Sequence, residues 1–267
     1  MLEANRAIGE LCVDWELPAI YRIHEEPDEK QLEMFVETVS RLGLRVKHPL
    51  TRQKLQAVID GVAGGELYDT VAMALLRTMK LARYFEHSSP HYALAFNRYL
   101  HFTSPIRRYP DLIVHRALES VFEPGEAAVP SKRPRGGGRL DEESLAELAH
   151  LAEHCSIRER AADRAEKALT RFRQLEYLND HMELAVEGTI RSVDEYGMMI
   201  ELTDVWVSAR AAISALPQDR YRFDKKRGVL KGKRRVYRAG DRVRTKVLEV
   251  DLVAGEVSVA VVLDGDV

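Results

Sequence analysis

The segment HFTSPIRRYPD, residues 101–111, is the most informative stretch of this 267-residue sequence. Its two prolines fix their own φ angles and favour extended backbone at the residues that precede them. Arg107 and Arg108 lie between the prolines, and Asp111 then opens a predicted helix. Planar guanidinium groups held beside a helix N-terminus suit a bound phosphate. A rigid turn whose arginines pair with nearby carboxylates explains the same residues equally well.

The residues on both sides of this segment show helical periodicity. Apolar residues recur at helical spacing over residues 28–43 and again over 66–85, and a third helix is expected from Asp111. Residues 141–179 form a very long periodic stretch, which predicts either one helix or two joined at a bend. The Pro-, Gly- and Arg-rich residues 124–139 are expected to form a mobile surface loop.

The hydrophobic period changes after residue 182. Four short segments bounded by Gly and Asp then read as strands, at residues 185–193, 197–202, 242–250 and 256–261. Short strands over roughly 80 residues predict a small antiparallel barrel of the OB-fold type. We therefore expect an α+β protein with two domains, a mostly helical one over residues 1–182 and the barrel over residues 183–263.

The charged residues are unevenly distributed. The whole chain carries 40 Lys and Arg against 42 Asp and Glu, a net charge of -2, which excludes a uniformly basic protein that coats nucleic acid. Residues 220–246, however, contain 13 basic side chains and only Asp224 and Asp241 as acids. This cluster predicts a polyanionic partner, with a solvated charged hairpin as the alternative.

Other features limit the class of protein. The two cysteines, Cys12 and Cys155, are too few for a disulfide framework or a zinc knuckle. No apolar run approaches the roughly 20 residues of a membrane helix, and the first residues do not resemble a signal peptide. We therefore expect a reduced cytoplasmic protein without a membrane partner.

A second motif suggests a different chemistry. Residues 150–154, HLAEH, match the H-x-x-E-H pattern of inverted zinc peptidases and would place His150 and His154 on one helix face. A chance match in a charged helix, with one histidine packed in the core, is the more economical interpretation. In the barrel, Tyr196 with Arg191 could stack and hold RNA bases, or Tyr196 could simply pack within its strand.

Taken together, these segments closely resemble the exoribonucleases of the RNase II/RNase R family. The resemblance rests on the proline-bracketed segment and on the order and spacing of four blocks, which are YRIH at 21–24, HFTSPIRRYPDL at 101–112 with HR at 115–116, HCS at 154–156 followed by ERAAD at 159–163, and YRFD at 221–224. It covers almost the whole chain. It implies the C-terminal part of an RNB-type catalytic domain, followed by an OB-fold RNA-binding domain of the ribosomal protein S1 type.

The resemblance also implies an activity, a cofactor and site residues. Such enzymes hydrolyse single-stranded RNA processively from the 3′ end to nucleoside 5′-monophosphates, using magnesium. Arg107 would contact the scissile or an adjacent phosphate, and Glu166 matches an acidic position near the active site. The side chains expected to bind RNA are Ser104, Arg108, Tyr109, Arg191, Tyr196, Lys225, Lys226, Arg227, Lys233 and Arg234.

Two departures from the family pattern modify these expectations. The metal-binding aspartates and the aromatic base clamp belong to the first half of the RNB domain, which is missing here, so we expect no metal site and little activity from this chain alone. Met198 and Met199 occupy positions where the family pattern predicts stacking aromatics. The alternative function is a non-catalytic RNA-binding protein that acts through its barrel. The expected partners are single-stranded RNA and either the missing N-terminal half or a second copy of the chain.

Overall fold

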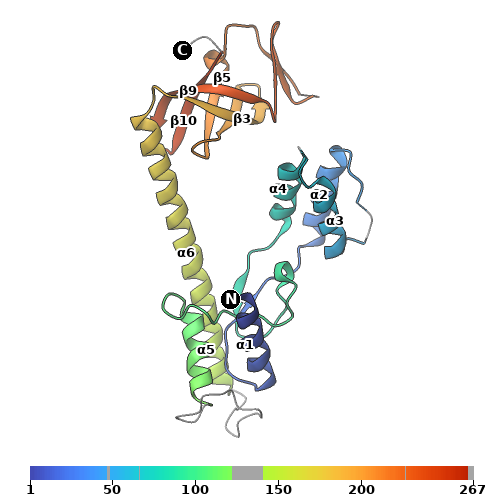
Figure 1. Ribbon diagram of the computed structural model, residues 1–267, viewed down its shortest axis with the longest axis vertical. Helices are drawn as coiled ribbons and strands as arrows, with labels where there is room; N and C mark the ends of the chain where they lie inside the picture. Colours follow the sequence, from blue (N-terminus) through green and yellow to red (C-terminus); the bar gives the residue numbers. More distant parts are fainter. Residues whose placement is uncertain (47–48, 66, 122–140, 226, 264–267) are drawn as a thin grey trace. The chain divides into compact units, whose positions relative to one another are not determined.

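The computed structural model describes residues 1–46, 49–65, 67–121, 141–225 and 227–263. The chain divides into two compact units, Met1–Glu159 and Arg160–Val267. The loop predicted at 124–139 lies outside the described residues. The α+β class is confirmed, because helices dominate the first unit and a closed five-stranded barrel dominates the second (Figure 1).

The first unit is built mainly from helices and one short antiparallel sheet. Its complete elements are α1 (Leu2–Asp14), β1 (Tyr21–Ile23), α2 (Glu29–Arg41), α3 (Arg52–Val62), α4 (Tyr68–Thr78), β2 (Arg83–Phe85), the 3-10 turn η1 (Tyr92–Leu94) and α5 (Tyr109–Glu119). The helix predicted over 66–85 was wrong in its last seven residues, because the backbone becomes extended at Met79 and β2 then pairs with β1. Helix α5 begins at Tyr109, two residues before the predicted start.

Helix α6 (Glu142–Asp180) is one continuous element of 39 residues, which decides between the two interpretations of this stretch (Figure 1). Asp141 caps its N-terminus, as predicted, because its Oδ1 accepts a hydrogen bond from the Ser144 backbone N–H at 2.8 Å. The helix begins in the first unit, where Leu148 and Ala152 are buried, and ends in the second, where Leu175 is buried in the barrel core.

The barrel forms from five strands in the order β10-β5-β4-β3-β9. Its strands are β3 (Ala185–Asp194), β4 (Gly197–Leu202), β5 (Val207–Ala212), β9 (Arg242–Asp251) and β10 (Glu256–Val262). All neighbours pair antiparallel except β10 and β5, whose parallel contact at Ser258 and Arg210 closes the barrel. Gly197 allows the close approach of β4 to β5, because an added Cβ would lie 2.1 Å from the Ala211 carbonyl oxygen.

Alternating residues of these strands fill the barrel. Met198, Ile200, Val207 and Val259 are fully buried. Met198 therefore occupies a core position, and the expectation that it replaces an exposed stacking aromatic was wrong for this residue, because the strand directs it inward. Within the described ranges, no helix is both long and apolar enough to cross a membrane.

A three-stranded sheet is inserted between β5 and β9. It contains β6 (Arg222–Asp224), β7 (Val229–Lys231) and β8 (Val236–Arg238), and follows the 3-10 turn η2 (Ile213–Ala215). Phe223, Leu230 and Tyr237 are direct cross-strand partners and share the face that packs on the barrel core. We call this sheet the basic arm, since it carries much of the cationic cluster at 220–246.

A cluster of buried aromatic rings supports the segment before α5. The Tyr84 hydroxyl lies 3.0 Å from His101 Nδ1, and the rings of His91 and His101 each meet Tyr99 edge to face. Burial, with the nearby charges of Arg108 and Arg22, lowers the pKa of His101 to about 4. Burial, with the neighbouring His24 and Arg22, lowers the pKa of His91 to about 4 as well. The folded protein therefore keeps both imidazoles neutral.

These depressed values predict a pH-dependent stability of the first unit. Between pH 6.5 and about 4, His91 and His101 bind protons in the unfolded chain but not in the folded protein. The contribution of these histidines to the free energy of unfolding is therefore greatest above pH 6.5 and falls as the pH decreases towards 4. Denaturant titrations at several pH values would measure it, with the emission of buried Trp15 reporting this unit. His101→Gln should flatten the dependence, whereas His154→Gln, at an exposed position, should not. Equal flattening by both variants would contradict the assignment.

Candidate functional site

The proline-bracketed segment forms a tight turn directly before α5. The backbone N–H groups of Arg107 and Arg108 both donate to the Ser104 carbonyl oxygen, at 3.2 and 3.1 Å. Arg108 is extended, with φ -125° and ψ 114°, and serves as the N-cap of α5. Pro110 lies in the first helical turn, where its missing N–H is not needed. Backbone hydrogen bonds and the two prolines therefore define the turn without any contribution from side-chain hydrogen bonds.

A buried carboxylate locks this turn. Asp111 is fully buried, and its Oδ1 accepts hydrogen bonds from the Ser104 backbone N–H at 2.8 Å and from Arg108 Nη2 at 2.7 Å. Arg108 Nε adds a third contact at 3.2 Å. Asp111 Oδ2 is also buried and has no hydrogen-bond partner among the described residues. Charge-assisted bonds of this kind are strong, so Arg108 is held against the protein.

The neighbouring Arg107 has the opposite environment. Its side chain is exposed and makes no hydrogen bond or ion pair with any residue that the structure describes. Ile106 beside it is fully exposed, and Tyr109 is 46% exposed. The two interpretations of the segment therefore apply to different residues. Arg108 is the arginine paired with a carboxylate, and Arg107 is an exposed cation on a rigid turn with no partner in the described part of the chain. Ser104 contributes its backbone to the lock.

The back of the segment is anchored to α1 and α5. The Phe102 N–H donates to Asn5 Oδ1 at 3.0 Å, and His115 Nε2 lies 2.9 Å from the Phe102 carbonyl oxygen. The Phe102 and His115 rings stack at 4.3 Å with an interplanar angle of 9°. These contacts explain why His115 belongs to the same motif as the segment, since it holds the backbone that leads into the turn.

The remaining motifs of the first unit meet at the β1–β2 sheet. Arg22 Nη1 donates to Glu159 Oε2 at 2.6 Å, and its guanidinium lies 4.6 Å from the centre of the Tyr84 ring. The Tyr84 backbone N–H donates to the Ser156 hydroxyl at 2.9 Å. The YRIH block and the α6 blocks that contain Ser156 and Glu159 therefore form one structural junction, which fixes β1 and β2 to the helix.

The residues do not fit a metal site. No group of three His, Cys, Asp or Glu side chains that could hold an ion exists in the described parts of the chain. His150 and His154 are both exposed on α6 and have no third ligand there, so the zinc-peptidase hypothesis has no structural support, and the expectation that one of them is packed in the core was wrong. Glu166 is also exposed on α6, within the second unit.

The predicted barrel residues lie at its surface. Tyr196 is 68% exposed in the turn between β3 and β4, and its backbone N–H donates to Asp194 Oδ1 at 2.8 Å. Arg191 is exposed, with its Nε 3.8 Å from Glu201 Oε2. Arg210 Nη2 donates to both carboxylate oxygens of Asp194, at 3.0 and 3.1 Å. Tyr196 and Arg191 are thus available to a ligand, whereas Arg210 mainly supports the turn.

The predicted cations of the basic arm separate into two groups. Lys225 and Arg227 lie in the turn between β6 and β7, whereas Lys233 and Arg234 lie in the turn between β7 and β8, at the opposite end of the sheet. Asp219 fixes the second turn, because its carboxylate accepts the backbone N–H groups of Lys233 and Arg234 at 3.0 and 2.8 Å. The predicted Lys226 lies outside the described residues.

A third group of cations on the arm was missed by the sequence analysis. Arg222 and Lys231 are direct cross-strand partners, and Arg238 lies on the same solvent face. This face is opposite the partly buried Phe223 and its buried partners. All three are exposed. Arg222 and Lys231 have no ion pair with a described residue, while Arg238 lies 3.6 Å from Asp241. The alternation of cationic and apolar residues in RFD, VLK and VYR was the available signal.

Comparison with known proteins identifies both parts of the chain. Residues 1–124 match the RNB domain and residues 183–261 match the S1 RNA binding domain. Ribonuclease R of Vibrio parahaemolyticus is 38% identical over 260 residues, which cover 94% of this chain and 30% of the relative. Ribonuclease R of Thermotoga maritima is 34% identical over 266 residues, covering 98% and 36%. The chain thus spans about a third of the length of these relatives.

Solved structures show the same fold. The apo form of Mycoplasma genitalium RNase R superposes with a TM-score of 0.73 at 23% identity, covering 98% of this chain and 40% of that one. The same bacterial protein has been solved in complex with ribose-methylated single-stranded RNA, also with a TM-score of 0.73. From the two domain matches and the relatives that extend over nearly all of its residues, the chain is a homologue of ribonuclease R that carries RNB-domain sequence followed by an S1 RNA binding domain.

Proposed function

We propose that this chain forms part of an exoribonuclease that hydrolyses single-stranded RNA processively from its 3′ end to nucleoside 5′-monophosphates. The observation that carries the proposal is the exposed guanidinium of Arg107, which has no partner among the described residues. It lies on a turn that Asp111 holds, within residues that match the RNB domain. A fixed cation that is not engaged by the protein is free to bind a phosphate. The RNA complex of the Mycoplasma relative supports the same ligand.

Arg107 would act on the RNA backbone at the point of cleavage. Its guanidinium can donate two parallel hydrogen bonds to phosphate oxygens and stabilise the negative charge that develops there. Because Arg108 and the Ser104 N–H are engaged by Asp111, this charge does not depend on a mobile loop. The exposed ring of Tyr109 lies in the first turn of α5 and offers a surface on which a neighbouring nucleotide can rest.

The magnesium that the family resemblance implies does not fit these residues. Its ligands are oxygen atoms, chiefly carboxylates, and the part of the chain that the structure describes has no suitable group of three acids. We therefore propose that the metal-binding acids belong to polypeptide outside these 267 residues. Within this chain, Arg107 supplies phosphate binding and charge stabilisation, and the barrel supplies further RNA contacts.

This division predicts very weak hydrolysis by the chain alone. A single-stranded oligonucleotide labelled at its 3′ end should release almost no mononucleotide when incubated with the purified chain and magnesium, although the chain binds it. Labelled mononucleotide would be measured by gel or thin-layer separation, with a ribonuclease R relative as the positive control. Robust release that persists after further purification would contradict the proposed lack of metal-binding acids.

Arg107 and Arg108 predict different effects on RNA binding and stability. Arg107→Ala should weaken binding of a single-stranded oligonucleotide and reduce the magnitude of its log-log salt slope by about 0.7, the contribution of one phosphate contact. It should leave the melting temperature unchanged, because the side chain has no partner among the described residues. Arg108→Ala should instead lower the melting temperature, because it leaves the buried Asp111 carboxylate without its ion-pair partner.

Fluorescence anisotropy at several salt concentrations and thermal melts would measure these effects. Arg116→Ala is a matched control, since Arg116 is another exposed arginine of the same motif. An unchanged salt slope in Arg107→Ala, or an equal loss in Arg116→Ala, would remove Arg107 from the RNA-binding surface.

A second candidate function is RNA binding without catalysis, through the barrel and the basic arm. The observation in its favour is the cationic solvent face formed by Arg222, Lys231 and Arg238, outside the RNB-matched residues. Direct cross-strand partners stand about 5 Å apart, so Arg222 and Lys231 repel each other unless an anion lies between them. An RNA backbone would provide that anion.

The arm predicts an additive loss of phosphate contacts. The double variant Arg222→Ala/Lys231→Ala should reduce the magnitude of the salt slope by about 1.4, twice the contribution of a single phosphate contact. Lys30→Ala/Arg41→Ala removes two exposed charges from α2 and serves as the control. If the control changes the slope as much as the arm variant, binding depends only on total charge and not on this face.

A further inference from the structure

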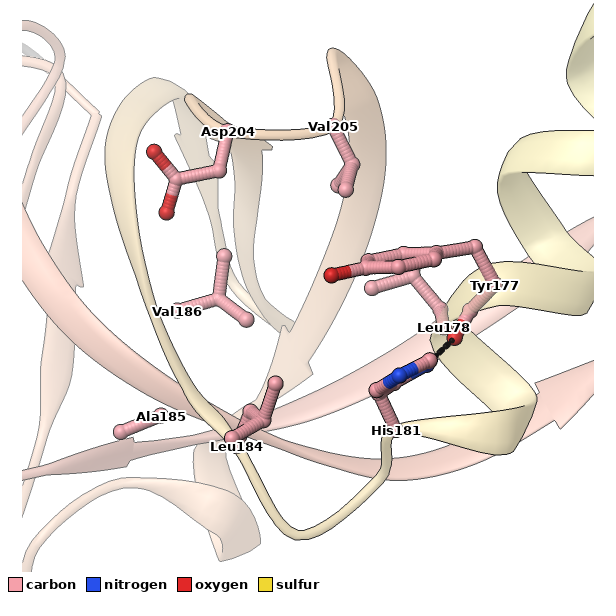
Figure 2. Close-up of a pocket in the computed structure, with 8 residues that line it drawn as sticks. All are labelled: Tyr177, Leu178, His181, Leu184, Ala185, Val186, Asp204 and Val205. Carbon is pink, nitrogen blue, oxygen red and sulfur yellow. Dashed lines mark hydrogen bonds between the residues drawn. The ribbon is translucent and has the colours of Figure 1, made fainter.

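A groove lies between the last turns of α6 and the turn that joins β4 to β5, within the second unit. It consists of two adjoining cavities of about 340 and 580 Å³, both lined by Tyr177, Asp204 and Val205. Figure 2 shows the first cavity, with Tyr177 of α6 and His181, which directly follows the helix, facing Val205 of the turn and Val186 of β3. Trp206 lines the second cavity. None of the RNA-binding residues discussed above lines either one.

Aromatic rings are exposed along this groove. The Tyr177 and His181 rings stack at 4.3 Å with an interplanar angle of 24°, and Tyr177 is 49% exposed. Trp206 is 70% exposed. Exposed clusters of large apolar side chains usually mark a binding surface, because an isolated protein gains nothing from leaving them in water.

The turn that presents Trp206 is rigid and strained. Gln174 Nε2, on α6, donates to the Val205 carbonyl oxygen at 2.8 Å, and the Trp206 N–H donates to the Leu202 carbonyl oxygen at 2.8 Å. Trp206 has φ +54°, a left-handed conformation that is sterically unfavourable for an L-residue other than glycine. The protein accepts this cost for a side chain that it does not bury, and such outliers point to function.

We propose that this groove binds bases of single-stranded RNA, which stack on Trp206 and Tyr177. The inference extends the proposed RNA-binding function to a site that holds bases, whereas Arg107 and the basic arm hold phosphates. The barrel side of the groove supports this ligand, because residues 184–186 and 204–206 line the groove and lie within the S1 RNA binding domain match. Every base has a flat face, so an aromatic platform accepts any of them.

The charge at the rim favours a base over a phosphate. Asp204 is exposed and has no hydrogen bond or ion pair with a residue that the structure describes. Its carboxylate repels a phosphate but accepts hydrogen bonds from the N–H groups at the edge of a base. Arg173, the cation that lines the groove, is paired with Glu176 at 2.7 Å. The backbone of the bound strand therefore remains outside the groove.

Two binding measurements on the full chain test this site. Octa-adenylate is the probe, because purines stack most strongly, and an abasic oligonucleotide of equal length is its phosphate-only counterpart. Octa-adenylate should quench the emission of exposed Trp206, since the only other tryptophan, Trp15, is buried. The abasic strand should not quench it. Anisotropy of the labelled strands gives the affinity of each variant without relying on tryptophan emission.

Trp206→Gly is the decisive variant, because glycine adopts a positive φ without strain and the turn should keep its conformation. It should raise the Kd for octa-adenylate about five- to one-hundred-fold, as loss of one base–aromatic stack does, with no decrease in melting temperature. Tyr177→Leu should also weaken binding, while Tyr177→Phe should retain it. Val253→Ala, which shortens an even more exposed apolar side chain in another turn of the barrel, should have no effect.

The outcomes separate this inference from the proposed function. Binding of octa-adenylate without quenching, equal quenching by the abasic strand, or an unchanged Kd in Trp206→Gly would overturn the base-binding groove and leave RNA binding at the phosphate surfaces intact. In the case of an unchanged Kd in Trp206→Gly, the exposed rings would instead be interpreted as a binding surface for a protein partner. Failure of the chain to bind either strand would overturn both the groove and the proposed function.

Discussion

The pairing of buried Asp111 with Arg108 and the Ser104 N–H is the interaction on which the candidate site depends. It closes a turn of eight residues through one carboxylate oxygen in the protein interior. Removing Arg108 would leave the buried Asp111 carboxylate without its cation, and breaking a buried ion pair in this way costs about 3–5 kcal/mol. The same contact distinguishes the two arginines. Asp111 binds Arg108, whereas the adjacent Arg107 is exposed on the same turn and has no partner among the described residues.

In the second unit, the basic arm uses one face for packing and the opposite face for exposed charges. The inner face of the basic arm contributes Leu230 and Tyr237 to the barrel core, so its cationic outer face is carried by a sheet that cannot shift without disturbing that core. Strand alternation places Arg222 and Lys231 outward at the same time. The charge cluster of residues 220–246 is therefore an ordered surface in its strands, and its turns carry the remaining cations.

Much of this architecture could be predicted from hydrophobic periodicity. Four of the five barrel strands and the long helix are segments with a clear period of 2.0 or 3.6, and the structure has them within one or two residues of the predicted bounds. Strand β5 was not predicted. Strands β1 and β2 were missed because three residues are too few to show a period, and their existence depends on pairing between residues 21–23 and 83–85. Helix α4 ends early for the same reason, since tertiary pairing overrides local propensity.

The site was less predictable, because its chemistry depends on partners and not on residue types. Adjacent arginines look alike in a sequence, and only the i to i+3 contact with buried Asp111 distinguishes the anchored Arg108 from the free Arg107. Met198 illustrates the converse: its position beside Met199 suggests a surface pair, yet alternation sends one inward and leaves the other half-exposed. Trp206 gave no sequence signal, since its importance lies in a positive φ and an exposed ring that only coordinates reveal.

The distribution of charges argues for a protein that holds RNA at several points. One free arginine on a rigid turn gives orientation but little affinity, since a single phosphate contact is readily lost to salt. A cationic sheet face increases the affinity for RNA but does not fix the position of the strand, because exposed cations attract any polyanion. Aromatic platforms add contacts that salt does not screen. The described residues of this chain offer all three kinds of contact and no group of acids that could hold a metal. The proposed function therefore gives them the binding of the strand and places its cleavage at carboxylates outside the described residues.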